Sequence, residues 1–494
     1  MDCNQETKNM QIPPSEIRDA FAKAMSKMFA KEVPMYSKLT ALVDHVNKKT
    51  LQADETLRSS LQATDDLDRI SCERHGAIRL GTAKELATIK RILSIMGMFP
   101  TGYYDLSAAG IPVHATCFRP HDATELSKNP FRLFVSLLRP ELIESDALRA
   151  RVVSIISRRQ IFNAQILQLL KTFDKNGGVN HSESEELVKE AVNIFQWKNE
   201  ASIAKADYEK LMEEGAVLAD IVAFPNPHIN HLTPRTLDID SVQSTMQEWG
   251  IPFKDCIEGP PKRKCPIVLR QTSFKAVEEN VSFPAAEFLS NDTTEPLSDR
   301  HGYHTARFGE IEQRGAALTR KGRSYYDHLL RLALEKEVTA LDTNAFTAIF
   351  SKFPDTWDEL RLQGLVWFKY YVPAIITHDR PPNLGTFSLN KLVNAGWIKY
   401  EPIIYEDFLP ISAAGIFRSN ISGQGKSSKP VRTYLNINSK GLFEEALGSN
   451  VSDEFEIYES IEKESITRCR ELYERDRVTR RPEYGNQVLM YLNE

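Results

Sequence analysis

The chain lacks long apolar runs, an excess of positive charge and paired cysteines. No stretch of about 18 apolar residues occurs in its 494 residues, so we expect no membrane-spanning helix and no membrane partner. The net charge of -5 argues against a protein dedicated to binding nucleic acid. The polar start of the chain predicts no secretory signal. Its six cysteines form no C-x-x-C pair, which is typical of reduced thiols, and we expect a cytoplasmic protein.

Common nucleotide-binding and hydrolase motifs are also absent. The sequence contains no G-x-G-x-x-G, H-E-x-x-H or G-x-S-x-G motif. Gly425, Lys426 and Ser427 resemble the end of a phosphate-binding loop, but the first glycine of that motif is replaced by Asn420. These absences leave histidines and carboxylates as the candidates for chemistry.

The stretch 307–315 (RFGEIEQRG) is spaced like a strand, yet it carries two carboxylates and two guanidinium groups. Alternation along a strand places Glu310, Glu312 and Arg314 on one face. Carboxylates on a strand that also belongs to the core are costly to bury unless they are paired or bind a metal. The stretch therefore predicts either salt bridges with Arg307 and Arg314 or a metal ligand, and alternation alone does not decide between the two.

A second informative stretch, 72–81, is predicted to be a strand that leads into a helix. Thr82 and Glu85 form a capping box, and apolar residues then recur at helical spacing. On the strand, His75 and Arg79 share one face at about 13 Å from each other along the backbone. This arrangement suits a metal at one end and a substrate carboxylate at the other, or simply a buried histidine beside a surface arginine.

The third stretch, 225–235, contains His228 and His231. Its three prolines disfavour a helix, and on a strand two residues three apart lie on opposite faces, so only one histidine can easily serve a given site. One histidine near 75, one near 231 and one carboxylate near 310 make a two-histidine, one-carboxylate set. Such a set suits non-haem iron(II) because it leaves ligand positions open for substrate and dioxygen.

Four stretches closely resemble the 2-oxoadipate dioxygenase/decarboxylase family, whose members are also called 2-hydroxyglutarate synthases. They are 74–79 (RHGAIR), 228–235 (HINHLTPR), 307–315 and 407–417 (DFLPISAAGIF). The resemblance runs from about residue 15 to beyond residue 460, which is nearly the whole chain. It implies membership of the vicinal oxygen chelate superfamily, in which paired βαβββ modules curl around a metal.

The resemblance implies that His75, His231 and Glu310 bind the metal. The strand 308–314 is also similar to the carboxylate-bearing strand of hydroxyphenylpyruvate dioxygenase, and this similarity favours Glu310 over Glu312. The three metal ligands would act as catalytic residues together with Arg79. We expect a supporting role, without metal binding, for three further side chains: His228, Glu312 and Arg314.

The resemblance also implies a substrate site. Arg79 would hold a substrate carboxylate, and His75 would face the substrate as well as the metal. Ile411 and Ser412 would contact the substrate from the small-residue run that follows Asp407. Ile411 stands where bacterial members are expected to have valine, and a contact made through the backbone would survive that change.

We expect an α+β protein in which vicinal oxygen chelate-like βαβββ modules form a curved central sheet around the metal, with extensive helical additions. Residues 1–494 would form a single catalytic unit. The spacing of Phe131, Phe134, Leu137 and Leu138 predicts that 130–213 is mainly helical. The expected parts are N-terminal packing helices at 15–66, a first metal-bearing module at 67–125, a helical insertion at 126–215, a second metal-bearing module at 216–318, and a C-terminal helical region at 319–494 with a substrate loop at 406–420.

The family resemblance implies an iron(II)-dependent oxidative decarboxylation and hydroxylation. The 2-oxo dicarboxylic acid 2-oxoadipate would react with dioxygen to give 2-hydroxyglutarate and carbon dioxide, in lysine catabolism. Fe(2+) would be the cofactor, and the sequence indicates nothing about protein partners. Two alternatives stay open: a zinc-dependent hydrolase or isomerase on the same scaffold, and a non-catalytic protein that binds metal or ligand.

Overall fold

The computed structural model describes residues 11–63, 66–284, 300–338, 341–373, 386–409 and 438–479. Two modules with the order β–α–β–β–β form its centre. The first consists of β1 (Arg74–Leu80), α6 (Ala83–Ile95), β2 (Phe99–Asp105), β3 (Val113–Arg119) and β4 (Arg132–Leu138). The second consists of β5 (His231–Pro234), α13 (Ile239–Glu248), β6 (Leu269–Ser273), β7 (Val277–Ser282) and β8 (His301–Arg314). The expected α+β fold with paired βαβββ modules is confirmed.

The two modules join into one eight-stranded sheet. The strand order is β2-β3-β4-β1-β5-β8-β6, and β7 pairs with β8. The modules meet where β1 and β5 pair antiparallel, with Ala77 opposite His231 and His75 opposite Thr233. β5 then pairs parallel with β8, with His231 opposite Phe308. The three strands that carry the expected metal ligands are therefore direct neighbours in the middle of the sheet.

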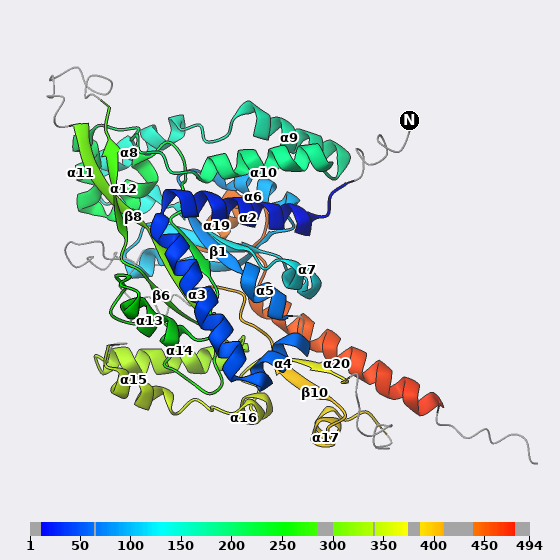
Figure 1. Ribbon diagram of the computed structural model, residues 1–494. Coiled ribbons are helices and arrows are strands. Elements are labelled where there is room, and N and C mark those ends of the chain that lie inside the picture. The colour runs from blue at the N-terminus through cyan, green and yellow to red at the C-terminus, as the bar shows by residue number, and fades with distance from the viewer. Residues whose placement is uncertain are drawn as a thin grey trace, which may run out of the picture.

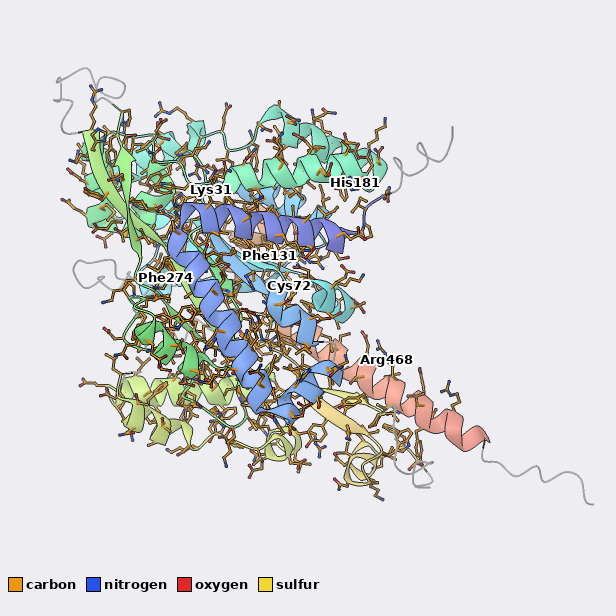
Figure 2. All side chains as sticks on the ribbon, in the orientation of Figure 1. Lys31, Cys72, Phe131, His181, Phe274 and Arg468 are labelled. Carbon is orange, nitrogen blue, oxygen red and sulfur yellow. The ribbon has the colours of Figure 1, made fainter. Side chains whose placement is uncertain are left out.

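Helices cover one face of this sheet (Figure 1). Helices α2 (Pro14–Glu32), α3 (Pro34–Ala53) and α10 (His181–Phe195) share a core with α6 and with the apolar side chains of β1. On β1, Ile78 and Leu80 are fully buried in that core, so alternation turns His75 and Arg79 to the other face. Phe131 lies beneath α2, and Phe274 lies beside α3 (Figure 2).

The capping box after β1 is present as expected. The Thr82 hydroxyl accepts a hydrogen bond from the Glu85 backbone N–H, and the Glu85 carboxylate accepts one from the Thr82 N–H, both at 3.2 Å. Glu85 also accepts the Gly81 N–H at 2.7 Å. This cap ends β1 directly after Leu80 and so fixes where the strand that carries His75 and Arg79 stops.

The helical prediction for 131–138 is wrong, because this segment is strand β4. β4 lies between β1 and β3, and six of its seven residues are buried, so both of its faces are covered. A strand buried on both faces loses the alternation of polar and apolar residues, and a short apolar run then looks the same as a buried helix. The first module therefore extends to Leu138, and the helices of the expected insertion begin only after it.

The helices between the modules are α8 (Asp146–Arg158), α9 (Ala164–Asn176), α10, α11 (Lys205–Glu214) and α12 (Ala216–Ala223). The C-terminal region builds a second core from α14 (Arg320–Glu335), α15 (Thr343–Phe350), α16 (Trp357–Leu362), α17 (Leu389–Asn394), a two-stranded antiparallel sheet of β9 (Phe368–Tyr371) and β10 (Lys399–Pro402), and α20 (Glu454–Thr479). α19 (Ser439–Leu447) packs on the first core instead. Within the described residues, none of the helices combines the length and the apolar character that crossing a bilayer requires.

Gly309 lets β8 approach the helix layer closely, directly beside Glu310. A Cβ atom at Gly309 would lie 2.3 Å from Phe274 Cε1 and 2.8 Å from Leu39 Cδ2. We predict that Gly309→Ala lowers the free energy of unfolding by about 1–3 kcal/mol because the core is already full. The measurement is chemical unfolding beside Gly215→Ala, whose added methyl group meets nothing within 4 Å. Equal stability of the two variants would contradict the close packing of β8.

Candidate metal centre

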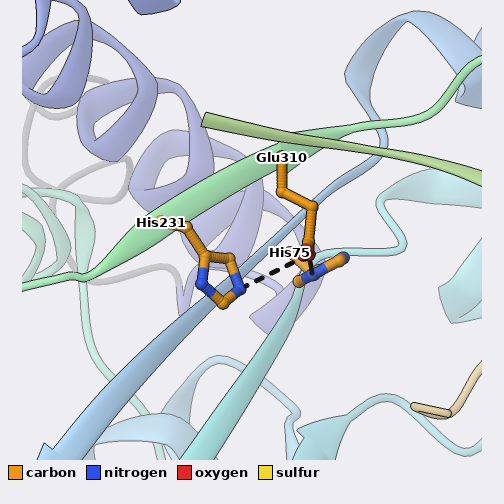
Figure 3. Close-up of side chains that lie close together, drawn as sticks. All are labelled: His75, His231 and Glu310. Carbon is orange, nitrogen blue, oxygen red and sulfur yellow. Dashed lines mark ion pairs between the residues drawn. The ribbon is translucent and has the colours of Figure 1, made fainter. Parts of the chain in front are cut away.

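Three neighbouring strands bring His75, His231 and Glu310 together on the face opposite the helices of the first core. His75 comes from β1, His231 from the start of β5 and Glu310 from β8. Their donor atoms lie within 4.8 Å of one another (Figure 3). The strand register explains this, because Ala77 pairs with His231 and His231 pairs with Phe308, two residues before Glu310. Side chains two residues apart on a strand share a face.

The donor atoms of these residues are arranged to hold a metal ion. The Nε2 atom of His75 lies 3.3 Å from Glu310 Oε2, and the Nε2 atom of His231 lies 3.8 Å from the same oxygen. Among the described residues, neither Nε2 atom has a hydrogen-bond partner, although both are buried. Ligands that bind one ion at about 2.1 Å lie roughly 3.0–3.4 Å from each other, close to these separations. Two unpartnered imidazole nitrogens beside one carboxylate oxygen fit a divalent metal.

The protonation states favour the same reading. Burial lowers the pKa of His231 to about 4, so its ring is neutral at pH 7 and offers a lone pair. Burial works against ionisation of Glu310, but His231 and His75 outweigh it and hold the pKa of Glu310 below its usual value. Burial likewise opposes a charge on His75, yet Glu312 and Glu310 raise its pKa above the usual value. A divalent cation would replace this proton and neutralise the paired carboxylates.

Glu312 lies behind the His75 ring and does not belong to the group of three. Its Oε2 atom is 3.0 Å from His75 Nδ1. Arg314 donates to both Glu312 oxygens, each at 2.8 Å. Burial raises the pKa of Glu312, but Arg314 and His75 outweigh it and bring it to about 2. A carboxylate at the far nitrogen of a metal-binding imidazole orients the ring and makes its other nitrogen a better ligand.

A network of buried ion pairs continues from Arg314 to the C-terminal region. Glu73 contacts Arg132 at 2.7 Å and Arg235 at 2.8 Å. Glu406 forms ion pairs with Arg132 and with Arg69, whose Nη2 atom lies 2.7 Å from Glu406 Oε1. The network links β1, β4 and β8 to the segment that begins the expected substrate loop.

Asp407 and Phe408 fix that segment against the metal centre. Arg119 donates to both oxygens of Asp407, at 2.7 and 3.0 Å, and the Tyr458 hydroxyl donates at 2.5 Å. The Phe408 ring centroid lies 4.8 Å from that of His75, at an angle of 84°. The start of the expected substrate loop thus reaches the metal centre. The two expected substrate contacts in this loop, Ile411 and Ser412, lie outside the described residues.

Arg79 shares the sheet face of the metal centre and forms an ion pair. Its Nη1 atom donates to Asp220 Oδ2 at 2.5 Å. The Arg79 side chain is 22% exposed and the Asp220 side chain 4%, so the guanidinium lies at the boundary between protein and solvent. Asp220 comes from α12, a helix of the expected insertion. Part of the Arg79 side chain is therefore accessible.

His228 does not contribute to the metal centre; it joins a second buried group with Asp220 and His304. His228 Nε2 lies 3.1 Å and His304 Nε2 2.8 Å from Asp220 Oδ1. The expectation that only one of His228 and His231 serves the metal centre agrees with this placement. Burial lowers the pKa of His228, so it contacts Asp220 as a neutral ring.

Two residues close to the site were missed by sequence reasoning. The sequence does contain a sign that Asp220 is functional, because it is the single charged residue in the apolar helix sequence AVLADIVA. No sequence pattern points to Lys254, because it lies in a connecting segment without a motif. Its Nζ atom is buried, has no hydrogen-bond partner among the described residues and lies 5.5 Å from the Phe308 ring centroid. Phe308 in turn packs against His231, with ring centroids 5.1 Å apart.

Known proteins are similar to this chain over most of its length. A protein-family model for 2-oxoadipate dioxygenase/decarboxylase matches residues 21–420. The 2-oxoadipate dioxygenase/decarboxylase of Escherichia coli (strain K12) is 47% identical over 459 residues, which cover 93% of this chain and 98% of that protein. The protein of the same name from Pseudomonas putida is 43% identical over 465 residues, which cover 93% of this chain and 97% of that protein.

Solved structures show the same similarity. The crystal structure of hydroxyglutarate synthase from Pseudomonas putida matches with a TM-score of 0.81 at 40% sequence identity. The crystal structure of that synthase in complex with 2-oxoadipate matches with a TM-score of 0.82 at 41% identity. Each match covers 94% of this chain and 100% of the other.

The two carboxylates of β8 provide a matched test of the metal centre. We predict that Glu310→Gln abolishes metal binding because it removes the charged ligand. Glu312→Gln should still bind one metal ion at saturation, but on the order of 10–100-fold more weakly, because the His75 ring loses its partner. Anaerobic titration with Fe(2+) and metal analysis measure both effects. A Glu312→Gln protein without metal beside a Glu310→Gln protein with normal affinity would reverse the assignment.

Proposed function

Because the chain belongs to the 2-oxoadipate dioxygenase/decarboxylase family, we propose that it converts 2-oxoadipate and dioxygen into 2-hydroxyglutarate and carbon dioxide. The observation that supports this most directly is the convergence of His75, His231 and Glu310 on one face of the sheet. A 2-oxoadipate complex of a structurally similar synthase supports the choice of substrate.

The proposed reaction balances without a second 2-oxo acid. The bond between the carboxylate carbon and the ketone carbon of 2-oxoadipate breaks, and the carboxylate leaves as carbon dioxide. The ketone carbon becomes a new carboxylate and takes up one oxygen atom of dioxygen. The neighbouring carbon becomes hydroxylated and takes up the other. Both electron pairs needed to reduce dioxygen come from the substrate itself, which is why no external reductant is required.

We propose that the metal is iron(II), held by His75, His231 and Glu310. Two histidines and one carboxylate on one side of an ion leave positions for a bidentate 2-oxo acid and for dioxygen. When bound, iron would orient the 2-oxo acid and exchange electrons with dioxygen. The protein contributes the arrangement of the donors. His231 is the most exposed of the three ligands, with 15% of its side chain accessible, and it marks the side from which a substrate can enter.

We propose that Arg79 holds the distal carboxylate of 2-oxoadipate. It lies four residues from His75 on the same strand, about 13 Å along the backbone, and its long side chain can lean back over part of that distance. A charge-assisted hydrogen bond from a guanidinium to a carboxylate contributes roughly 1.5–3 kcal/mol. Contacts from Ile411 and Ser412 to the substrate are proposed on the family resemblance. We also propose that the reaction takes place in the cytoplasm and serves lysine catabolism, as the resemblance implies.

Oxygen uptake tests the proposed function. We predict that the anaerobically iron-loaded protein consumes dioxygen with 2-oxoadipate and releases carbon dioxide in equal amount. With 2-oxohexanoate, which has the same chain length but an uncharged tail, turnover efficiency should be on the order of 10–100-fold lower, because Arg79 loses its partner.

The control for this experiment is the zinc-loaded protein, which should consume no dioxygen because zinc(II) does not change its oxidation state. Conversion of 2-oxo acids by the zinc form alone would favour the hydrolase or isomerase alternative. Binding of 2-oxoadipate without oxygen uptake under either metal would favour a non-catalytic binding protein.

A further inference from the structure

Asp220 is a buried carboxylate in an apolar helix, and four side chains approach it. Its Oδ2 atom accepts hydrogen bonds from Arg79 Nη1 at 2.5 Å and from Asn230 Nδ2 at 3.2 Å. Its Oδ1 atom lies 2.8 Å from His304 Nε2 and 3.1 Å from His228 Nε2. The Asp220 side chain is only 4% exposed. Both oxygens are therefore fully used, which compensates the cost of burying the charge.

The partners of Asp220 come from separate parts of the fold. Arg79 lies on β1, His304 near the start of β8, and Asn230 directly before His231. A second layer holds His304 in turn, because the Tyr208 hydroxyl of α11 lies 2.9 Å from its Nδ1 atom. The helices inserted between the modules thus supply both the carboxylate and one of its supports. None of the three proposed metal ligands belongs to this arrangement, and Arg79, at 22%, has its most exposed side chain.

We infer that Asp220 is a positioning residue that holds the Arg79 guanidinium in place for the distal carboxylate of the substrate. This inference rests on the proposed function. Arginine has a long side chain, and fixing it only when substrate binds would cost rotamer entropy. Asp220 engages Nη1 and so restricts the position of the guanidinium before substrate arrives. Within the described residues the Nε and Nη2 groups of Arg79 make no hydrogen bond, which leaves them for a two-point contact with a carboxylate.

The other partners of Asp220 keep Arg79 effective as a cation. A carboxylate paired with Arg79 alone would cancel much of the attraction between the guanidinium and a substrate anion. Asn230 and the two histidines share the negative charge of Asp220, because each is placed to donate to it. Asp220 can thus orient Arg79 while Arg79 still attracts a second carboxylate.

A second metal ion in the group of Asp220, His228 and His304 is the competing explanation. The surroundings oppose it, because the Arg79 guanidinium contacts the same carboxylate and a divalent cation would repel it. The His304 Nε2 atom is already in a hydrogen bond with Asp220, in contrast to the unpartnered Nε2 atoms of His75 and His231. The metal content of the protein distinguishes the two explanations.

The test measures anaerobic binding of 2-oxoadipate and 2-oxohexanoate to the iron-loaded protein by calorimetry. Asp220→Asn should bind 2-oxoadipate on the order of 10-fold more weakly, because an amide nitrogen or a neutral oxygen then faces Arg79. Its affinity for 2-oxohexanoate should stay within about twofold of the parent protein. In an Arg79→Ala background, Asp220→Asn should have no further effect on either ligand. The number of iron ions per chain should stay at one.

Asp240→Asn is the matched control, because Asp240 forms a bidentate pair with Arg270, at 2.7 and 3.0 Å, outside the site. It should change neither affinity. His304→Leu and His304→Gln keep the inference testable if Asp220→Asn does not fold. Leucine removes the donor to Asp220 and should weaken 2-oxoadipate binding selectively, whereas glutamine retains an N–H donor and should restore it.

Four results would overturn the inference. Equal weakening for both ligands would make Asp220 a structural residue, and unchanged 2-oxoadipate binding in Asp220→Asn would remove its role altogether. Two metal ions in the parent and one in Asp220→Asn would identify a second metal site. A parent protein that prefers 2-oxoadipate over 2-oxohexanoate but consumes no dioxygen would overturn the proposed function and leave the role of Asp220 standing. A parent that binds both ligands equally would overturn the role of Arg79 and Asp220, while oxygen uptake would still decide the proposed function.

Discussion

The structure around the site depends on charged and polar partners that offset the cost of burying two carboxylates on one core strand. Glu310 and Glu312 are 3% and 0% exposed, and an isolated buried carboxylate is too costly to keep its charge. Glu312 is compensated by the bidentate pair with Arg314 and by the His75 ring. Glu310 faces two imidazole nitrogens that make no hydrogen bond within the described part of the chain. Glu312 therefore has an arginine partner of its own, whereas Glu310 faces the two histidines with which we propose that it holds a metal ion.

The ion pairs that offset these buried charges also connect distant parts of the chain to the site. The arginines that balance Glu73, Glu312 and Glu406 come from the segment before β1, from β4, from the residue after β5 and from β8. Arg119 at the end of β3 pairs with Asp407. Loss of one partner from such a pair typically costs 3–5 kcal/mol, whereas the pair as a whole contributes little to stability. The ion pairs therefore specify where β1, β8 and the segment around Phe408 lie relative to one another. That precision is what a metal centre built from three strands needs.

The sequence indicated the three proposed metal ligands better than their surroundings. His75, His231 and Glu310 could be placed because each lies in a short stretch with strand alternation, and the family resemblance separated Glu310 from Glu312. β4 was read as a helix because burial on both faces removes the alternating pattern. The ion pair between Arg79 and Asp220 joins residues 141 positions apart, and local patterns carry no information about such a contact. A lone aspartate in an apolar helix was the one indication of it.

The most direct test of the central claim is turnover of 2-oxoadipate under oxygen-18 gas, with mass analysis of the product. We predict that 2-hydroxyglutarate carries two labelled oxygens, one in the hydroxyl group and one in the carboxylate formed from the ketone carbon. His231→Ala should form no labelled product. Product whose new oxygens come from water instead of dioxygen would contradict a dioxygenase reaction at His75, His231 and Glu310.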